Sequence, residues 1–223
     1  MIIAIDGPAG SGKSTAARAL AARYGMGYLD TGAMYRCVTL AALRAGALAA
    51  APERLAELAA AADIRFGPLE DGRQQVWLGE EDVTQAIREE ALTESIRQVS
   101  QVPEVRRVLV RRQREMGIAL LEQNGGCVIE GRDIGTTVFP DAYRKFWLQA
   151  DLVVRAERRA QEAGGDESAA RQTVMLHRRD EADHNPAAGS MVKAHDAITV
   201  DTTEMDPEAV VNHLAAGAGL PVV

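Results

Sequence analysis

Residues 7–14 are Gly7-Pro8-Ala9-Gly10-Ser11-Gly12-Lys13-Ser14. This stretch fits G-x-x-x-x-G-K-[ST], the pattern of loops that hold the phosphates of a nucleoside triphosphate. Residues 1–6 before it are typical of a buried strand, and the Ala-rich residues 15–24 after it are typical of a helix. In such a unit, backbone N–H groups and the helix N-terminus converge on phosphate oxygens. A glycine-rich turn with a chance Lys-Ser pair is the alternative, and eight matched positions argue against it.

The loop predicts the donor half of a phosphoryl-transfer site. We assign these residues to binding the triphosphate: Gly7, Pro8, Ala9, Gly10, Ser11, Gly12, Lys13, Ser14 and Thr15. Glycines let the backbone curl without Cβ clashes. Lys13 is expected to contact the β- and γ-phosphates, and the Ser14 hydroxyl to ligate Mg²⁺. The loop does not say which group receives the phosphoryl.

Composition excludes several classes of function. The 223 residues suit one α/β domain, and 47% hydrophobic with 26% charged residues indicates a globular chain. A net charge of -7 and only 4% aromatic residues argue against nucleic acid as a partner. With no apolar run of membrane-spanning length, no signal peptide and two distant cysteines taken as buried thiols, we expect a cytoplasmic monomer that does not contact membranes.

Strand patterns alternate with helix patterns, which predicts a parallel sheet flanked by helices in three layers. The residue pattern differs at 63–66 and 75–78, where polar and apolar side chains alternate on either side of the turn signal Glu70-Asp71-Gly72. This predicts a small inserted antiparallel hairpin. We expect a single domain over residues 1–223, with a core of about 1–62 and 103–223, an inserted acceptor-binding region of about 63–102, and a short Arg-rich lid of about 152–168.

A second anion site is predicted where the second strand ends. Residues 30–36, DTGAMYR, place the Thr31 hydroxyl at a helix N-terminus and Arg36 further along that helix. Ligands of open α/β sheets bind beyond the carboxyl ends of the strands. A capped helix with a solvated Arg explains these residues equally well on their own.

Charged residues also follow the buried strand at 127–130. Arg132 and Asp133 lie between glycines, where charges are costly unless they are paired or used, so we expect them to anchor a polar ligand. Glu130 suits either the second shell of Mg²⁺ or a structural role. Arg106, one turn into a helix that starts at Pro103, stands out from arginines expected on a solvated face.

Arginines follow the strand at 145–149 as well. Arg155, Arg158 and Arg159 are placed to close over a transferring phosphoryl group and to stabilise its charge. A lattice of surface ion pairs accounts for some of the arginines in this part of the chain.

Several segments occur together in a fixed order. They are GPAGSGKS (7–14), LDTGAMYR (29–36), PEVR (103–106) with RRQR (111–114), EGRDIGTTVFPDA (130–142), RRDEAD (178–183) and DAITVDTT (196–203). With this set the chain resembles the bacterial cytidylate kinases over essentially its whole length, inserted region included. The resemblance implies a nucleoside monophosphate kinase fold, ATP as donor with Mg²⁺, and phosphoryl transfer to CMP or dCMP.

The resemblance also implies roles for single residues. Thr31, Arg36 and Arg132 would hold the acceptor phosphate. Arg106 and Asp133 would contact the cytosine edge, and Arg179 and Asp183 the pentose. Lys13, Arg132, Arg155, Arg158 and Arg159 would be catalytic, and residues 201–203 would lie near the adenine of ATP.

At two positions the chain departs from the family pattern. An Arg common three residues after Asp183 is Pro186 here, and a Ser expected near the cytosine falls on Arg97. Two other classes of function are weighed against the resemblance: a P-loop kinase with a different acceptor, and a P-loop switch protein. Together, Arg36, Arg106, Arg132 and Asp133 favour an acceptor that has both a phosphate and a cytosine-like edge.

Overall fold

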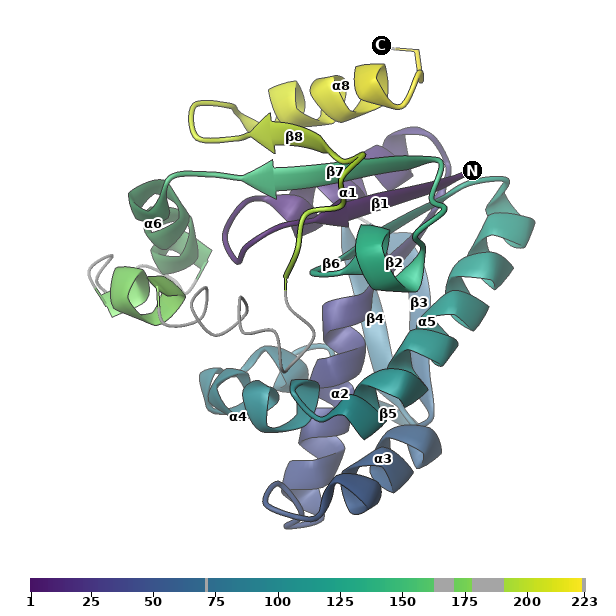
Figure 1. Cartoon of the computed structure of the whole chain (residues 1–223), viewed down its shortest axis with the longest axis vertical. Helices are drawn as coiled ribbons and strands as arrows, with labels where there is room; N and C mark the ends of the chain where they lie inside the picture. The colour runs from purple at the N-terminus through teal and green to yellow at the C-terminus, as the bar shows by residue number, and fades with distance from the viewer. Residues whose placement is uncertain (71, 163–170, 178–190, 222–223) are drawn as a thin grey trace.

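The computed structural model describes residues 1–70, 72–162, 171–177 and 191–221. Five strands form one sheet in which every neighbouring pair is parallel. In spatial order they are β2 (Gly27–Asp30), β6 (Cys127–Gly131), β1 (Ile2–Asp6), β7 (Arg144–Gln149) and β8 (Ile198–Asp201). The predicted parallel sheet is confirmed, and the carboxyl ends of its strands share one edge (Figure 1).

Helices cover both faces of this sheet, which confirms the three-layer α/β fold. They are α1 (Lys13–Arg23) and α8 (Pro207–Gly217) on one face, and α2 (Thr31–Arg44) and α5 (Pro103–Asn124) on the other. Strand β1 illustrates why both faces are covered, because its successive side chains point to opposite faces of the sheet. Ile3 and Ile5 pack with α1 and α8, whereas Ala4 packs with α2 and α5.

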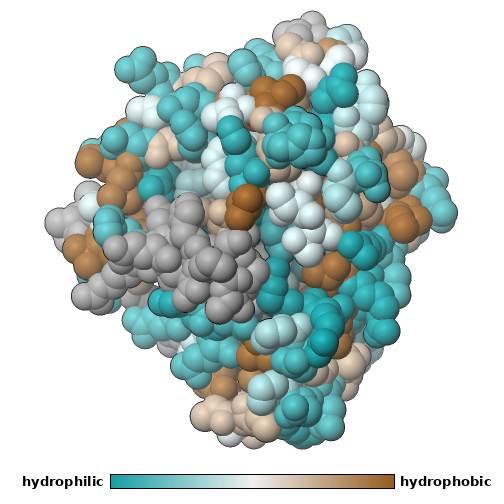
Figure 2. Space-filling view, viewed as in Figure 1, coloured by the Kyte–Doolittle hydropathy of each residue, from teal (hydrophilic) through white to brown (hydrophobic). Residues whose placement is uncertain are grey.

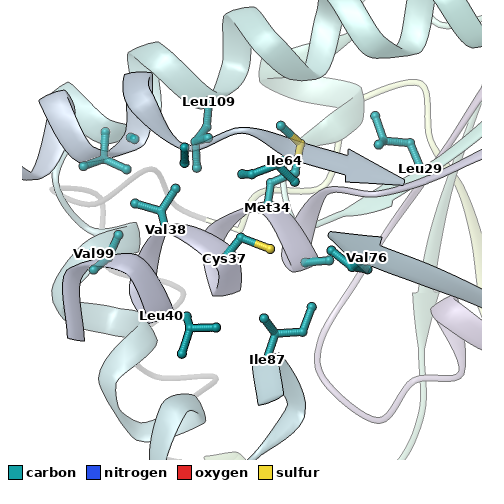
Figure 3. Packing of buried hydrophobic residues seen from close by; sticks show 14 of the residues in the cluster. Leu29, Met34, Cys37, Val38, Leu40, Ile64, Val76, Ile87, Val99 and Leu109 are labelled. Atoms are coloured by element: carbon teal, nitrogen blue, oxygen red, sulfur yellow. The ribbon is translucent and has the colours of Figure 1, made fainter. Parts of the chain in front are cut away.

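The inserted part of the chain is a small antiparallel sheet followed by helices, as predicted. It comprises β3 (Ile64–Glu70), β4 (Arg73–Leu78), β5 (Glu81–Asp82), the 3₁₀ turn η1 (Ala86–Arg88) and α4 (Glu90–Ser100). It shares a core with α2, α5 and the preceding helix α3 (Pro52–Ala61). Figure 3 shows Met34 and Val38 of α2 beside Leu109 of α5 and Ile64 of β3.

The two cysteines are free and buried, as predicted. Cys37 belongs to the core around α2, and Cys127 begins β6. Burial raises the pKa of each thiol to about 12, which keeps both protonated and unreactive near neutral pH.

One element was not predicted. Residues 134–138, which follow β6 and Asp133, form a single π-helical turn, η2 (Ile134–Val138). Such turns are rare and are frequently found at functional sites. The carboxylate of Asp6, at the end of β1, accepts hydrogen bonds from the backbone N–H groups of Ile134 and Gly135, and local sequence patterns contain no sign of this contact.

The Arg-rich segment begins with α6 (Leu152–Glu162). Residues 171–177 are helical too. The rest of the predicted lid, residues 163–168, lies outside the described residues.

In the described part of the chain, no helix is long and apolar enough to cross a membrane. The face shown in Figure 2 carries its hydrophobic side chains in small separate groups among hydrophilic ones.

Core packing against α5 is expected to dominate stability. Leu109 is fully buried, so Leu109→Ala should lower the free energy of unfolding by about 2–5 kcal/mol through lost contacts and a residual cavity. Ile118, on the same helix, is 47% exposed, and Ile118→Ala should change the free energy of unfolding by about 0.5 kcal/mol or less. Chemical denaturation of both variants measures the difference. Equal losses would contradict the assignment of the core.

Candidate active site

The predicted donor loop joins β1 to α1 and is held in shape by hydrogen bonds from its own side chains to its backbone. Gly7 has φ +145°, and a Cβ there would lie 2.0 Å from the carbonyl oxygen of Leu148 on β7. The hydroxyl of Ser11 donates to the carbonyl oxygen of Pro8 at 2.9 Å, and Nζ of Lys13 donates to the same oxygen at 2.7 Å. The buried ammonium group of Lys13 therefore lies inside the curve of the loop.

Two α6 arginines support the loop from its outer side. Arg155, which is 6% exposed, donates to the carbonyl oxygen of Ala9 at 3.2 Å. Arg158 donates to both the hydroxyl and the carbonyl oxygen of Thr202, at 3.0 and 2.7 Å. The Thr202 hydroxyl in turn donates to the carbonyl oxygen of Ser11 at 3.1 Å. Both arginines, predicted to be catalytic, thus lie at the loop.

The Arg132-Asp133 pair connects the donor loop to α5. Arg132 donates to the carbonyl oxygen of Gly7 at 3.2 Å. The next residue, Asp133, forms an ion pair with Arg106, and their side chains are 11% and 17% exposed. The family resemblance implied that Arg106 and Asp133 contact the same edge of a ligand, and the structure places the two side chains in contact with each other.

A buried carboxylate lies behind the predicted metal ligand. Glu130, near the end of β6, accepts hydrogen bonds from Ser14 at 2.8 Å and from the Tyr28 hydroxyl at 2.5 Å. Burial raises the pKa of Glu130, and the negative charge of Asp30 raises it further. The buried hydroxyl of Thr31 donates to the backbone oxygen of Glu130 at 2.7 Å. Ser14 and Thr31, from the two predicted anion sites, are therefore bound to one residue.

Arg36 extends from α2 towards the inserted region. Its guanidinium group donates to the carbonyl oxygen of Ile87 at 2.9 Å and to the hydroxyl of Thr93 at 2.8 Å. Burial lowers the pKa of Arg36 to about 10, and the positive charges of Arg159 and Arg132 act in the same direction. Arg159 and Arg132 therefore repel Arg36, whereas Asp30 attracts it, and a bound anion would reduce the repulsion.

A cleft of about 950 Å³ opens beside the donor loop at the carboxyl ends of β7 and β8. It is lined by Pro8, Trp147, Gln149, Ala150, Asp151, Arg155, Met191, Asp201, Thr203, Glu204 and Met205. Asp201 and Thr203 belong to the segment that the sequence placed near the adenine of ATP. The cleft is large enough for a nucleoside.

Some predicted positions are not among the site residues that the structure describes. Arg179, Asp183 and Pro186 lie outside the described residues. Arg97, which stands where the family pattern has a Ser, is exposed on α4.

Comparison with known proteins identifies the family. The family described as cytidylate kinase matches residues 3–218. The chain belongs to the cytidylate kinase family. It is 42% identical to a cytidylate kinase of Symbiobacterium thermophilum, with 96% of this chain and 94% of that protein aligned. It is 43% identical to a cytidylate kinase of Streptococcus agalactiae, with 95% and 92% aligned.

Solved structures show the fold alone. An uncharacterized protein from Eubacterium ventriosum superposes with a TM-score of 0.53 at 13% sequence identity, and 98% of each chain is covered. The family resemblance drawn from the motifs is thus confirmed by sequence comparison over nearly the whole chain.

Sequence reasoning missed Asp6 as part of this cytidylate kinase site. Asp6 is 5% exposed and lies directly before the donor loop. Its one signal in the sequence is an acidic residue at the end of an otherwise apolar strand. Burial raises the pKa of Asp6 to about 6, despite the hydrogen bonds from Gly135 and Ile134. The nearby charges act in opposite directions, with Asp133 raising this pKa and Lys13 lowering it.

The raised pKa predicts a pH-dependent stability. Between about pH 4 and pH 6, the folded chain keeps a proton on Asp6 that the unfolded chain has released, so raising the pH destabilises the fold. The free energy of unfolding of the wild type, minus that of Asp6→Asn, should fall by about 3 kcal/mol over this range and then level off. Denaturation at several pH values measures it. A difference that does not change with pH would show that Asp6 titrates as in the unfolded chain.

Proposed function

We propose that this member of the cytidylate kinase family transfers the γ-phosphoryl group of ATP to CMP and dCMP, giving CDP and dCDP. The observation that carries the proposal is the position of two consecutive residues. Arg132 contacts the donor loop, while Asp133 pairs with Arg106 at 11% side-chain exposure. With these contacts, a donor site and a site for a polar base would meet at Arg132 and Asp133.

The donor half comprises the loop and the α6 arginines. Backbone N–H groups of residues 7–15 would hold the phosphates of ATP, and the cleft at β7 and β8 would hold its adenine. Lys13 would exchange its bond to the Pro8 oxygen for the β- and γ-phosphates. Arg155, Arg158 and Arg159 would stabilise charge on the transferred group.

The acceptor half comprises residues from α2, from α5 and from the segment between β6 and η2. Thr31, Arg36 and Arg132 would hold the phosphate of CMP, whose negative charge would favour binding beside these arginines. The carboxylate of Asp133 can accept a hydrogen bond from the amino group of cytosine, while Arg106 donates to its ring acceptors. Contacts of Arg179 and Asp183 with the pentose remain predictions.

In this arrangement the transfer needs no protein nucleophile. An oxygen of the CMP phosphate attacks the γ-phosphorus, and the bond to the β-γ bridging oxygen breaks, with ADP as the leaving group. The acceptor phosphate is already ionised near neutral pH, so it needs no general base. Positioning two polyanions and offsetting their charge provides the catalysis.

The residues fit a Mg²⁺ ion that arrives with ATP. Mg²⁺ binds oxygen ligands, usually one or two protein groups together with substrate phosphates. The Ser14 hydroxyl and the buried Glu130 carboxylate provide oxygens 2.8 Å apart at the donor loop. We propose that Ser14 ligates the ion and that Glu130 orients Ser14. When bound, the ion would neutralise phosphate charge.

Four further properties are proposed from the sequence. They are the cytoplasmic location, the monomeric state, the single-domain boundaries and the role of residues 63–102 in binding the acceptor.

The choice of acceptor is tested with a panel. Purified protein with ATP and Mg²⁺ should phosphorylate CMP and dCMP with a kcat/KM at least about 100-fold above that for UMP, because uracil would place a carbonyl oxygen against the buried Asp133 carboxylate where cytosine places its amino group. A coupled assay of ADP release, with AMP as a further acceptor, measures this. A clear preference for UMP or AMP would instead favour a P-loop kinase with another acceptor.

Neighbouring arginines of α5 provide a matched test of the base site. Arg106→Ala removes the partner of Asp133 and should raise the KM for CMP by about 10- to 100-fold, with the KM for ATP within about twofold. Arg107→Ala removes an exposed arginine that pairs with Glu104 and should change neither value by more than about twofold. Steady-state kinetics of both variants decide the matter. If the two KM values rise together in Arg106→Ala, Arg106 supports the fold and does not bind the base.

A further inference from the structure

We propose that Asp6 is a positioning residue that fixes the acceptor-binding residues relative to the donor loop; this inference rests on the function proposed above. Asp6 ends β1 and is 5% exposed. Its two carboxylate oxygens accept separate hydrogen bonds, one from the N–H of Ile134 and one from the N–H of Gly135, each at 2.8 Å. Asp6 is thus bound to the backbone of the π-turn η2.

This contact lies where the sheet no longer holds the two segments together. Asp6 and Gly131 are the last paired residues of β1 and β6. Beyond them the chains leave the sheet as the donor loop and as the segment that carries Arg132 and Asp133. Two contacts join the segments there in opposite directions: Asp6 accepts from η2, and Arg132 donates to Gly7.

The capping of η2 by a distant residue leaves Asp133 available. The residue before a helical turn usually accepts the free N–H groups itself. Asp133 occupies that place, yet among the described residues its side chain pairs with Arg106 and makes no capping bond. Because Asp6 takes over the cap, Asp133 can face the acceptor site.

A role in stability alone does not account for an acid at this position. Burying a carboxylate is costly, and burial raises the pKa of Asp6 to about 6. The charge of Asp133 adds to this cost, and that of Lys13 reduces it only in part. A carboxylate provides two acceptor oxygens for these two adjacent N–H groups, whereas an amide provides only one. The benefit is geometric, since it fixes the direction of the first turn of η2.

Asp6→Asn separates positioning from stability. The amide offers one acceptor oxygen, so one N–H of η2 loses its partner and Arg132-Asp133 can shift. The kcat for CDP formation should fall by about 10- to 100-fold, because small displacements of reacting groups are costly. The dissociation constant for ATP, measured by titration calorimetry, should stay within about twofold of the wild type.

Lys145→Met is the matched control. Lys145 lies on β7 and is 6% exposed, and its aliphatic part packs against the same Gly135. Its Nζ pairs with Asp196 at 2.9 Å and takes no part in the proposed site. This variant should alter the melting temperature, with the kcat within about twofold of the wild type.

Three results would overturn the positioning role. They are an Asp6→Asn kcat within twofold of the wild type, a loss of ATP affinity that parallels the loss of kcat, and a similar fall of kcat in Lys145→Met. If Asp6→Asn does not fold, Asp6→Glu replaces it, because Glu keeps both carboxylate oxygens but moves them by one methylene. For Asp6→Glu we expect the same fall in kcat with an unchanged dissociation constant for ATP. All variants are assayed with the acceptor nucleotide that the wild type prefers. The test of Asp6 therefore stays valid if that acceptor is not CMP or dCMP.

Discussion

The parallel register of β1 and β6 is the constraint on which the site depends. It pairs Asp6 with Gly131, so the donor loop and the segment that carries Arg132 leave the sheet side by side. The pairing of β2 with β6 then brings Thr31 to the same edge, and β7, on the other side of β1, leads into α6 and its arginines. Residues from distant parts of the sequence meet because four neighbouring strands end together.

Buried charge is the main cost of this arrangement. Asp6, Glu130 and Asp133 are nearly inaccessible to water, and burial raises the pKa of the first two. Each carboxylate accepts a hydrogen bond from a group of the site: Asp6 from the backbone of η2, Glu130 from Ser14, and Asp133 from Arg106. A core of apolar residues would be more stable, but it would not orient both halves of a phosphoryl-transfer site.

Local patterns in the sequence predicted the elements and the residue types well, because periodicity and turn residues are set by neighbours in the chain. The helix Thr31–Arg44 and the antiparallel pair β3 and β4 are examples. Side-chain partners were not predictable in this way. Asp6 meets η2 across more than 120 residues, and Arg36 bonds to Thr93 of the inserted region, so both contacts follow from tertiary packing. Motifs identified the candidate residues at the strand ends, but they did not predict which side chains contact one another.

One measurement tests directly whether donor and acceptor nucleotides lie side by side at this edge of the sheet. It is the affinity for a bisubstrate analogue in which adenosine and cytidine are joined at their 5′ ends by five phosphates. If the two sites are adjacent, the analogue should bind one to a chain, at least about 100-fold more tightly than ATP or CMP, and both nucleotides should compete with it. An analogue that binds no more tightly than ATP, and that CMP does not displace, would contradict this arrangement.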